Sequence, residues 1–319
     1  MLALVFPGQG SQYVGMGQDL YEAFPVVRAI FAQAEATLGF ALSDLCFAGP
    51  ADVLTDTINQ QPALLTTSIA ALRALASDQR GQGTLPSPAF VAGHSVGEYA
   101  ALVAAEALDF SDAVRLVRER GRLMKEAGER HPGGMAAILG LDDAAVEAIC
   151  QEASRQAGGP VVCANFNAPG QVVISGEKAA LEAASELAKT RGARRVIPLP
   201  ITIAAHSPLM REAAQKFATA VAATPFRTAR VPIVANVTAQ PIVAVDEIRA
   251  ELVQQLTSSV RWTQSVSFMT AQGVSQFVEV GPKDVLAGLI RRIAPQASAT
   301  SVGDVQTLAD SRWLMADSG

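Results

Sequence analysis

A short apolar run that leads into a glycine-flanked serine constrains this chain more than any other feature. Residues 89–92 are apolar, the next five read GHSVG, and an alanine-rich helical pattern continues to residue 108. This order predicts a strand, a sharp turn and a helix. The glycines two residues before and after Ser95 remove Cβ atoms that would clash in such a turn, so we expect Ser95 to have a strained backbone and to project above the sheet edge.

Ser95 at this position has the surroundings of a catalytic nucleophile. The amide of Val96 and those after it lie in the first turn of the expected helix, where unpaired N–H groups and the helix dipole favour a developing oxyanion. His94 and Glu98 add polar groups that a purely structural turn does not need. A G-x-S-x-G pentapeptide also arises by chance in a chain with 25 glycines, so a plain strand-to-helix turn is the alternative interpretation.

Composition limits the classes of protein to consider. The chain has 319 residues, 50% hydrophobic and 17% charged, so it can bury a large core and is long enough for two domains. It has no apolar run near the roughly 20 residues that span a bilayer and begins with the strand-like LALVF, so we expect a cytoplasmic protein without membrane contact. The net charge of −5 argues against nucleic-acid binding. Cys46, Cys150 and Cys163 lie far apart, which indicates neither a disulfide framework nor a zinc site.

The remaining apolar patterns predict a parallel sheet with flanking helices. Residues 2–6 form a continuous apolar run, as expected of a strand buried on both faces, and the glycine-rich segment 7–12 that follows can bring backbone amides or the Gln9 side chain to a ligand. An ordinary loop is the alternative for that segment. Helices are predicted near 21–38, 62–76 and 285–293, and strands at 231–237 and 276–280. The weakly patterned tail from Ala294 is expected to be partly mobile.

Between these parts lies a segment with a different element order. Strands are predicted at 135–139, 161–165, 171–175 and 195–198, and helices at 143–156 and 177–191, with a hairpin turn over 167–170. The resulting βαββαβ order is that of a ferredoxin-like unit. We therefore predict a large domain made of residues 1–130 and 201–319, with a small domain of residues 131–200 inserted into it.

The helix predicted over residues 111–127, with Ser111 as its N-cap, carries an arginine on the wrong face. Apolar residues gather on one side of this helix and basic residues on the other, but Arg120 falls in the middle of the apolar side. A guanidinium cannot lose its charge and is costly to bury unpaired, so Arg120 must meet an anion there. That anion is either a protein carboxylate or a ligand.

A serine nucleophile needs a base, and the chain has only three histidines. His94 is the neighbour of Ser95 and points elsewhere if Ser95 points up, and His131 lies in a polar loop rich in glycine and proline. His206, in LPITIAAHSPLM, remains as the candidate base. A structural histidine before a proline-initiated helix is the alternative.

Six ordered motifs give the chain a specific resemblance. They are FPGQGSQ (6–12), QPALLTTS (61–68), GHSVGEYAAL (93–102), RERGRLM (118–124), NFNAPGQVVISG (165–176) and EVGPKDVL (279–286), and they span nearly the whole sequence. With them the chain resembles the malonyl-CoA:acyl carrier protein transacylase family of fatty acid and polyketide synthesis. The resemblance implies an α/β-hydrolase-like large domain with an inserted ferredoxin-like domain, and an active site in the cleft between them.

The resemblance also implies roles for single residues. Ser95 would be the nucleophile and His206 the general base and acid, with the amides of Gln9 and Val96 as the oxyanion hole. Arg120 would hold the malonyl carboxylate, and a backbone carbonyl at Gln255 would orient the histidine. The further pocket candidates are His94, Asn165 and Ala205.

The implied reaction is malonyl transfer from malonyl-CoA to the phosphopantetheine thiol of acyl carrier protein through a malonyl-serine, without metal or bound cofactor, in a monomer. Ala205 is small and would leave room for methylmalonyl, whereas the apolar Val96 resembles malonyl-specific relatives, so we expect malonyl. The same fold could also serve an acyl-thioester hydrolase or a non-catalytic docking subunit. Because carrier proteins are generally acidic, candidate docking residues are those of two basic groups, Lys189, Arg191, Arg194 and Arg195, and Arg115, Arg118 and Arg122.

Overall fold

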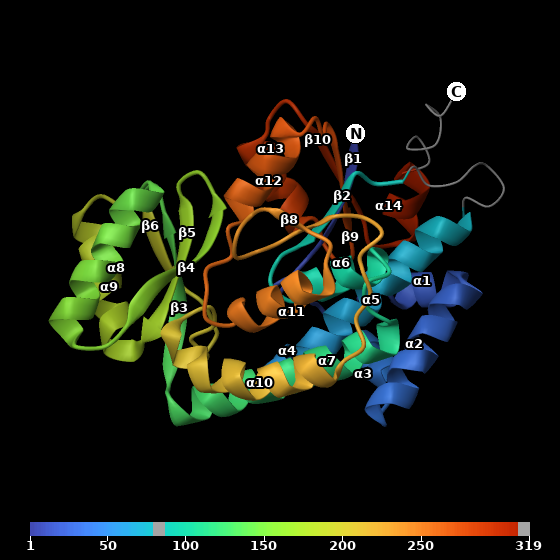
Figure 1. The fold of residues 1–319 in the computed structure, drawn as a ribbon, viewed down its shortest axis with the longest axis horizontal. Helices are drawn as coiled ribbons and strands as arrows, with labels where there is room; N and C mark the ends of the chain where they lie inside the picture. The colour runs from blue at the N-terminus through green and yellow to red at the C-terminus, as the bar shows by residue number, and fades with distance from the viewer. Residues whose placement is uncertain (79–86, 312–319) are drawn as a thin grey trace.

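A mostly parallel six-stranded sheet forms the centre of the larger part of the molecule (Figure 1). The computed structural model describes residues 1–78 and 87–311. The strands of this sheet are β1 (Leu2–Phe6), β2 (Phe90–Gly93), β7 (Ile233–Val234), β8 (Pro241–Ile242), β9 (Gln276–Val280) and β10 (Ser298–Val302). Their order is β10-β9-β1-β2-β7-β8, and all neighbours run parallel except β8, which is antiparallel to β7.

Both faces of this sheet are covered by helices, which explains why its central strands β1, β2 and β7 are apolar throughout. The helices of this part are α1 (Gln18–Ala23), α2 (Pro25–Leu38), α3 (Leu42–Ala48), α4 (Ala51–Thr55), α5 (Thr57–Asp78), α6 (Gly97–Ala104), α7 (Phe110–Arg130), α10 (Arg211–Ala223), α11 (Val245–Gln254), α12 (Trp262–Ala271), α13 (Val285–Ile293) and α14 (Val305–Asp310). Leu2, Leu4 and Phe6 point into a core shared with α2, α5, α6 and α7, whereas Ala3 and Val5 point into a second core shared with α12 and α13.

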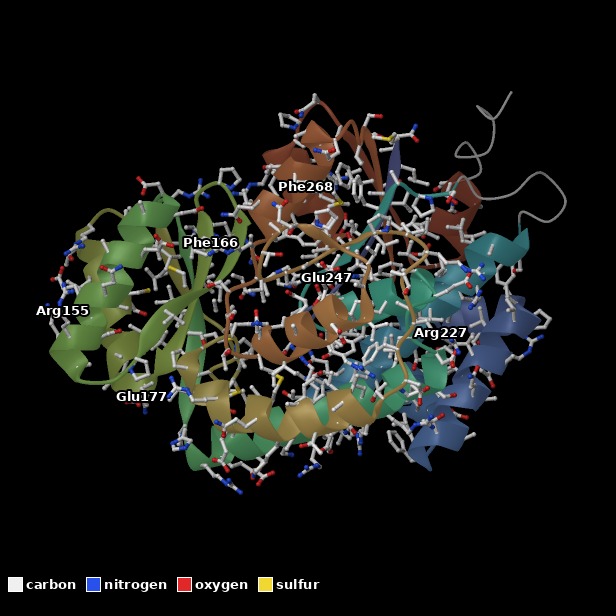
Figure 2. All side chains as sticks on the ribbon, in the orientation of Figure 1. Arg155, Phe166, Glu177, Arg227, Glu247 and Phe268 are labelled. Carbon is white, nitrogen blue, oxygen red and sulfur yellow. The ribbon has the colours of Figure 1, made fainter. Side chains whose placement is uncertain are left out.

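A four-stranded antiparallel sheet forms a second unit beside the first (Figure 1). It is built from β3 (Gly133–Leu139), α8 (Asp143–Ala157), β4 (Val161–Ala168), β5 (Gln171–Glu177), α9 (Lys178–Thr190) and β6 (Arg195–Pro198). The strand order β4-β5-β3-β6 is that of a ferredoxin-like unit, and α8 and α9 pack on one face around their own core. Figure 2 shows Arg155 of α8 on the outer side of this unit and Phe166 of β4 on the side of the large sheet.

The predicted fold class, a parallel α/β sheet with a ferredoxin-like unit, is confirmed. The second sheet lies within the predicted segment 131–200, although the division into domains at 130 and 200 stays a prediction. Among residues 1–78 and 87–311, no single helix is long and apolar enough to cross a membrane, and one pair, α2 with α3, meets that test only together and is bent by 117°.

The expectation for the start of α7 was wrong. Ser111 does not cap α7, because the helix already begins at Phe110 and its N-cap residue is Asp109, which makes no side-chain capping bond and instead pairs with Arg227. The expectation that the tail from Ala294 is partly mobile stays a prediction. In its described part, residues 298–302 form β10 alongside β9, and α14 follows its N-cap Asp304, which accepts from the Thr307 amide. Only residues 312–319 of that tail lie outside the described part of the chain.

The turn after β2 depends on two glycines for space. A Cβ on Gly93 would lie 2.0 Å from the carbonyl carbon of Gly97, and a Cβ on Gly97 would lie 2.2 Å from the carbonyl oxygen of Phe6. Neither neighbour can yield, because both are backbone atoms within the core. The glycines therefore let α6 begin directly above β1 and β2.

We predict that Gly97→Ala destabilises the fold strongly, by about 3 kcal/mol or more, because the added methyl must displace the β1 backbone. Urea denaturation of the purified variant measures the loss. Gly288→Ala in α13 is the matched control, since its Cβ would meet nothing within 4 Å and alanine favours the helix. Equal stability of the two variants would contradict this account of the turn.

Candidate active site

The serine at the end of β2 has the strained backbone that the sequence predicts. Ser95 has φ 51°, in the left-handed region that residues with a Cβ rarely adopt. Its amide donates to Asn236 Oδ1 at 2.8 Å, which fixes the turn from the adjacent part of the sheet. Among the described residues of the site, His206, with φ 57°, is the only other non-glycine residue with a left-handed backbone. Strain at both positions is typical of a functional site rather than of an ordinary turn.

Ser95 and His206 form a buried hydrogen-bonded pair. The Ser95 Oγ lies 2.8 Å from the His206 Nε2, although the two residues are separated by 111 positions in the chain. His206 Nδ1 lies 2.8 Å from the Gln255 carbonyl oxygen and 3.2 Å from that of Ser258. Because two carbonyls can only accept, Nδ1 carries the proton, and Nε2 is left as the acceptor for the serine hydroxyl.

The surroundings keep His206 neutral. Burial, and after it the nearby positive charge of Arg120, lower the pKa of His206 to about 3, although the bonds to the two carbonyls raise it. A neutral imidazole with its free nitrogen on the serine hydroxyl is the form that a general base requires.

Arg120 lies at the same serine, buried to 1% exposure. One terminal nitrogen, Nη2, donates to Ser95 Oγ at 3.1 Å and to Gln255 Oε1 at 2.9 Å, and Nη1 donates to Gln61 Oε1 at 2.9 Å. Within residues 1–78 and 87–311, no carboxylate forms an ion pair with it, and its Nε has no partner. The first interpretation from the sequence, a buried salt bridge, is therefore wrong for the described chain, and the charge of Arg120 is free for a ligand anion.

The two amides expected to bind an oxyanion lie at the turn. Val96 is the N-cap of α6, and the loop that carries Gln9 packs against the turn, since a Cβ on Gly8 would lie 2.3 Å from the His94 carbonyl oxygen. In the described part of the chain, neither the Gln9 nor the Val96 amide donates a hydrogen bond to a protein acceptor. Both amides therefore remain available to a ligand oxygen.

A buried polar network lies behind the site. Glu98 accepts from the Asn236 amide, from Asn236 Nδ2 and from Gln255 Nε2. Asn236 Nδ2 also donates to the Gly93 carbonyl, and Gln255 Nε2 to the Ser95 carbonyl. Burial raises the pKa of Glu98, and the negative charge of the neighbouring Glu251 raises it further. Burial also raises the pKa of Glu251, to about 7. The hydrogen-bond partners of the Glu98 oxygens in residues 1–78 and 87–311 are N–H donors, which lower the Glu98 pKa against the effect of burial.

The remaining pocket candidates differ in position. His94 Nε2 lies 2.8 Å from Asn167 Oδ1 rather than at Ser95, and burial lowers its pKa. Asn165 is buried on β4 and pairs with Val260. The asparagine that contacts His94 is Asn167, which the sequence predicts in the hairpin turn and the structure places on β4. Ala205 is buried immediately before His206.

A cavity of about 530 Å³ shares Gln9 with the site. Its other walls come from α4, the start of α5, the end of α7 and residues 200–203, which precede His206. In residues 1–78 and 87–311, no group of three or more histidine, cysteine or acidic side chains is arranged to hold a metal ion. A serine, a neutral histidine, two free amides and an unpaired cation can together carry out nucleophilic acyl transfer or hydrolysis on an acyl group that bears a negative charge.

The sequence matches the model of the acyl transferase domain family over residues 3–312. The chain belongs to this family. It is similar to the malonyl CoA-acyl carrier protein transacylases of Escherichia coli strain K12 (47% identity over 96% of this chain and 97% of the relative) and Bacillus subtilis strain 168 (45%, 96% and 95%). Among solved structures it resembles an acyl carrier protein S-malonyltransferase from Vibrio cholerae (TM-score 0.93, 43% identity, 98% and 99% coverage). It also resembles a malonyl-transacylase in complex with its type II PKS acyl-carrier protein (TM-score 0.92, 44% identity, 97% and 98% coverage).

Several residues of this acyltransferase site were not predicted. Asn236 and Ser258 lie in irregular segments after β7 and α11, where no pattern marks them. Gln61 belongs to one of the six motifs, and its place one helical turn before buried residues was the available signal for an inward-facing amide. Asn167 stands two residues from Asn165, the asparagine that the sequence indicates as a pocket candidate.

We predict that His206 of this acyltransferase stays neutral well below the ordinary histidine pKa of 6.5, because burial and Arg120 both oppose its charge. NMR titration of the labelled imidazoles from pH 8 downward measures this directly. In the control variant Arg120→Met, the loss of the nearby positive charge should raise the His206 pKa. A wild-type His206 that becomes protonated near pH 6.5 would contradict the prediction.

Proposed function

We propose that this acyltransferase transfers the malonyl group from malonyl-CoA to the phosphopantetheine thiol of an acyl carrier protein through a malonyl-serine at Ser95. The observation that carries the proposal is the buried, carboxylate-free guanidinium of Arg120 at 3.1 Å from the serine hydroxyl, within the described chain. An acyl donor with a terminal carboxylate fits that charge. The relatives, which are named malonyl transacylases, support the same donor and acceptor.

In the first half-reaction, His206 Nε2 takes the Ser95 proton while Oγ attacks the thioester carbonyl. The amides of Gln9 and Val96 bind the oxyanion. The tetrahedral intermediate then collapses, the carbon–sulfur bond breaks, and the proton on His206 passes to the departing coenzyme A thiolate. The products are free coenzyme A and the malonyl ester of Ser95.

The second half-reaction uses the same groups in the reverse direction. His206 takes the proton of the carrier phosphopantetheine thiol, the thiolate attacks the ester, and the proton returns to Ser95 as the serine leaves. The substrate carboxylate assists the base in both halves. When it binds Arg120, it offsets the positive charge that lowers the His206 pKa, so imidazolium forms more readily in the complex than in the free enzyme.

Arg120 also accounts for selectivity. A bidentate pair between its guanidinium and the malonyl carboxylate in a partly dry site contributes roughly 3 kcal/mol, on the order of 100-fold, against an acetyl group that lacks the carboxylate. Methylmalonyl differs by one methyl group, which a pocket distinguishes by only about 1 to 3 kcal/mol. The small, buried Ala205 leaves methylmalonyl as the nearest competing donor.

The experiment that tests the function is intact-protein mass spectrometry after brief incubation with malonyl-CoA, methylmalonyl-CoA or acetyl-CoA. We expect a malonyl adduct that is absent from Ser95→Ala, is stable in water and disappears when carrier protein is added. An adduct that is hydrolysed in water as fast as it disappears with carrier protein would favour a thioester hydrolase. An adduct that persists in Ser95→Ala would contradict the mechanism.

The companion variant Arg120→Ala should lose malonyl transfer by about 100-fold, because the carboxylate loses its partner, while acetyl transfer is kept or gained. Rates of adduct formation with the two donors measure the change. An equal loss with both donors would contradict the role of Arg120 in carboxylate binding.

We infer that the carrier protein docks on the basic group at the end of α9 and the start of β6. Lys189 and Arg191 already pair with Glu186 and Glu152, whereas Arg194 and Arg195 have no ion pair in residues 1–78 and 87–311. In the other candidate group on α7, Arg115 pairs with Asp112, and Arg122 with Glu119 and Glu126. Arg118 is half-buried and donates to the Ile58 carbonyl and to Asn59 Oδ1, whereas Arg194 and Arg195 are exposed. Free positive charge thus favours Arg194 and Arg195 for an acidic partner.

Charge reversal of both residues, Arg194→Glu with Arg195→Glu, should raise the KM for carrier protein at low salt and lose that effect at high salt, because surface attraction is screened. The KM for malonyl-CoA should not change. Arg115→Glu on α7 is the control. No change in the carrier KM of the double variant would contradict docking at this group.

We further infer that the enzyme acts as a monomer in the cytoplasm. One chain supplies the nucleophile, the base and the carboxylate-binding arginine, so the site needs no residue from a second copy. Analytical ultracentrifugation with and without carrier protein tests the monomer.

A further inference from the structure

Glu98 is a buried carboxylate that the proposed mechanism does not use. It lies in the first turn of α6, is 1% exposed, and touches neither Ser95 Oγ nor His206. Its Oε1 accepts from the backbone amide of Asn236 at 3.0 Å and from Asn236 Nδ2 at 2.8 Å, and its Oε2 accepts from Gln255 Nε2. A buried carboxyl group with three donors and no role in the proposed steps calls for a structural or functional reason.

The reason lies in the orientation of the Gln255 amide. An amide side chain has one end that only accepts and one that only donates, and the two ends are interchangeable in shape. Its Nε2 faces two acceptors, the Glu98 carboxylate and the Ser95 carbonyl at 3.2 Å. Its Oε1 consequently faces Arg120 Nη2 at 2.9 Å, where an acceptor is required because arginine only donates.

We propose that Glu98 is a positioning residue for malonyl recognition: acting through the Gln255 amide, it holds the Arg120 guanidinium at the serine. The inference rests on the proposed function, since it concerns the selectivity that Arg120 gives. Arg120 has only two other hydrogen-bond partners in the described chain, Gln61 and the Ser95 hydroxyl, so the Gln255 oxygen is one of two fixed acceptors that set the plane of the guanidinium. Loss of that acceptor frees Arg120 to turn away from the position in which it meets the substrate carboxylate.

The substitution Glu98→Gln changes this chain of contacts with almost no change in shape. The two Asn236 donors retain the side-chain oxygen of the new residue, so its NH₂ group must face Gln255 Nε2. Two donors then oppose each other. The Gln255 amide turns over or shifts, and it presents a donor to Arg120 in place of the acceptor.

The matched control is Glu251→Gln. Glu251 is a second buried carboxyl, 5% exposed, that accepts from the Val237 amide and makes no side-chain contact with Gln255 or Arg120 within the described residues. Its substitution removes a buried acid from the same region and leaves the orientation of Gln255 unchanged. A general loss of stability would therefore affect both variants, whereas only Glu98→Gln disturbs the contact with Arg120.

The experiment measures the ratio of malonyl to acetyl adduct formation on Ser95, from malonyl-CoA and acetyl-CoA separately, for wild type, Arg120→Ala, Glu98→Gln and Glu251→Gln. We expect the ratio to fall by about tenfold or more in Glu98→Gln, toward that of Arg120→Ala, with the loss mainly in malonyl kcat/KM. Glu251→Gln should keep the wild-type ratio. Thermal denaturation of each variant establishes that it is folded.

The outcomes separate this inference from the proposed function. A wild type without malonyl preference would overturn both. If wild type prefers malonyl and Arg120→Ala does not, a wild-type ratio in Glu98→Gln, or an equal fall in Glu251→Gln, would overturn the role of Glu98 alone. Should Glu98→Gln fail to fold, Gln255→Leu tests the same contact, because it retains the backbone carbonyl that holds His206; an unchanged ratio there would also overturn the proposal.

Discussion

The buried hydrogen bond between Ser95 and His206 is the interaction on which the rest of this site depends. It joins residues 111 positions apart and requires a left-handed backbone at both ends. Such conformations persist only where the surroundings determine them strongly. Asn236 holds the serine amide, and the carbonyls of Gln255 and Ser258 hold the histidine ring. The sheet supplies the fixed frame, since β2 and β7 are neighbours and place the serine turn next to the segment that carries Asn236.

The second constraint is the charge of Arg120. A buried guanidinium without a carboxylate partner is unfavourable by several kcal/mol in the free protein, and neutral amide oxygens offset only part of that penalty. The same charge lowers the His206 pKa and thus keeps the base neutral. A substrate carboxylate relieves both effects at once. The unfavourable free energy of the unpaired Arg120 charge is therefore recovered only when a donor with a carboxylate binds. This selects one class of acyl donor and favours proton transfer to His206 when that donor is present.

The sequence predicted those features that local pattern determines. The turn at Ser95, the βαββαβ order and the burial of Arg120 follow from glycine spacing, strand and helix periodicity and one cation on an apolar face. Features that depend on tertiary contact were missed. Asn236 and Ser258 act from irregular segments, and the pattern predicts Ser111 as an N-cap although α7 already begins at Phe110. The segment 298–302 has little pattern of its own and is a strand because β9 offers it a parallel edge.

The four-stranded sheet helps to hold the general base His206 in place, although its strands lie far from the Gln255 and Ser258 carbonyls in the sequence. The loop after α11, which carries the two carbonyls that hold His206, bonds to β4, the edge strand of that sheet. Val260 donates to the Ala164 carbonyl at 2.8 Å and accepts from the Phe166 amide at 2.9 Å, and Ser259 Oγ donates to the Cys163 carbonyl. Since β4 has β5 on its other side, the loop occupies its free edge and is held as firmly as a short strand. The four-stranded unit thus helps to fix the orientation of His206, because the loop whose carbonyls accept from the histidine ring is itself bonded to β4.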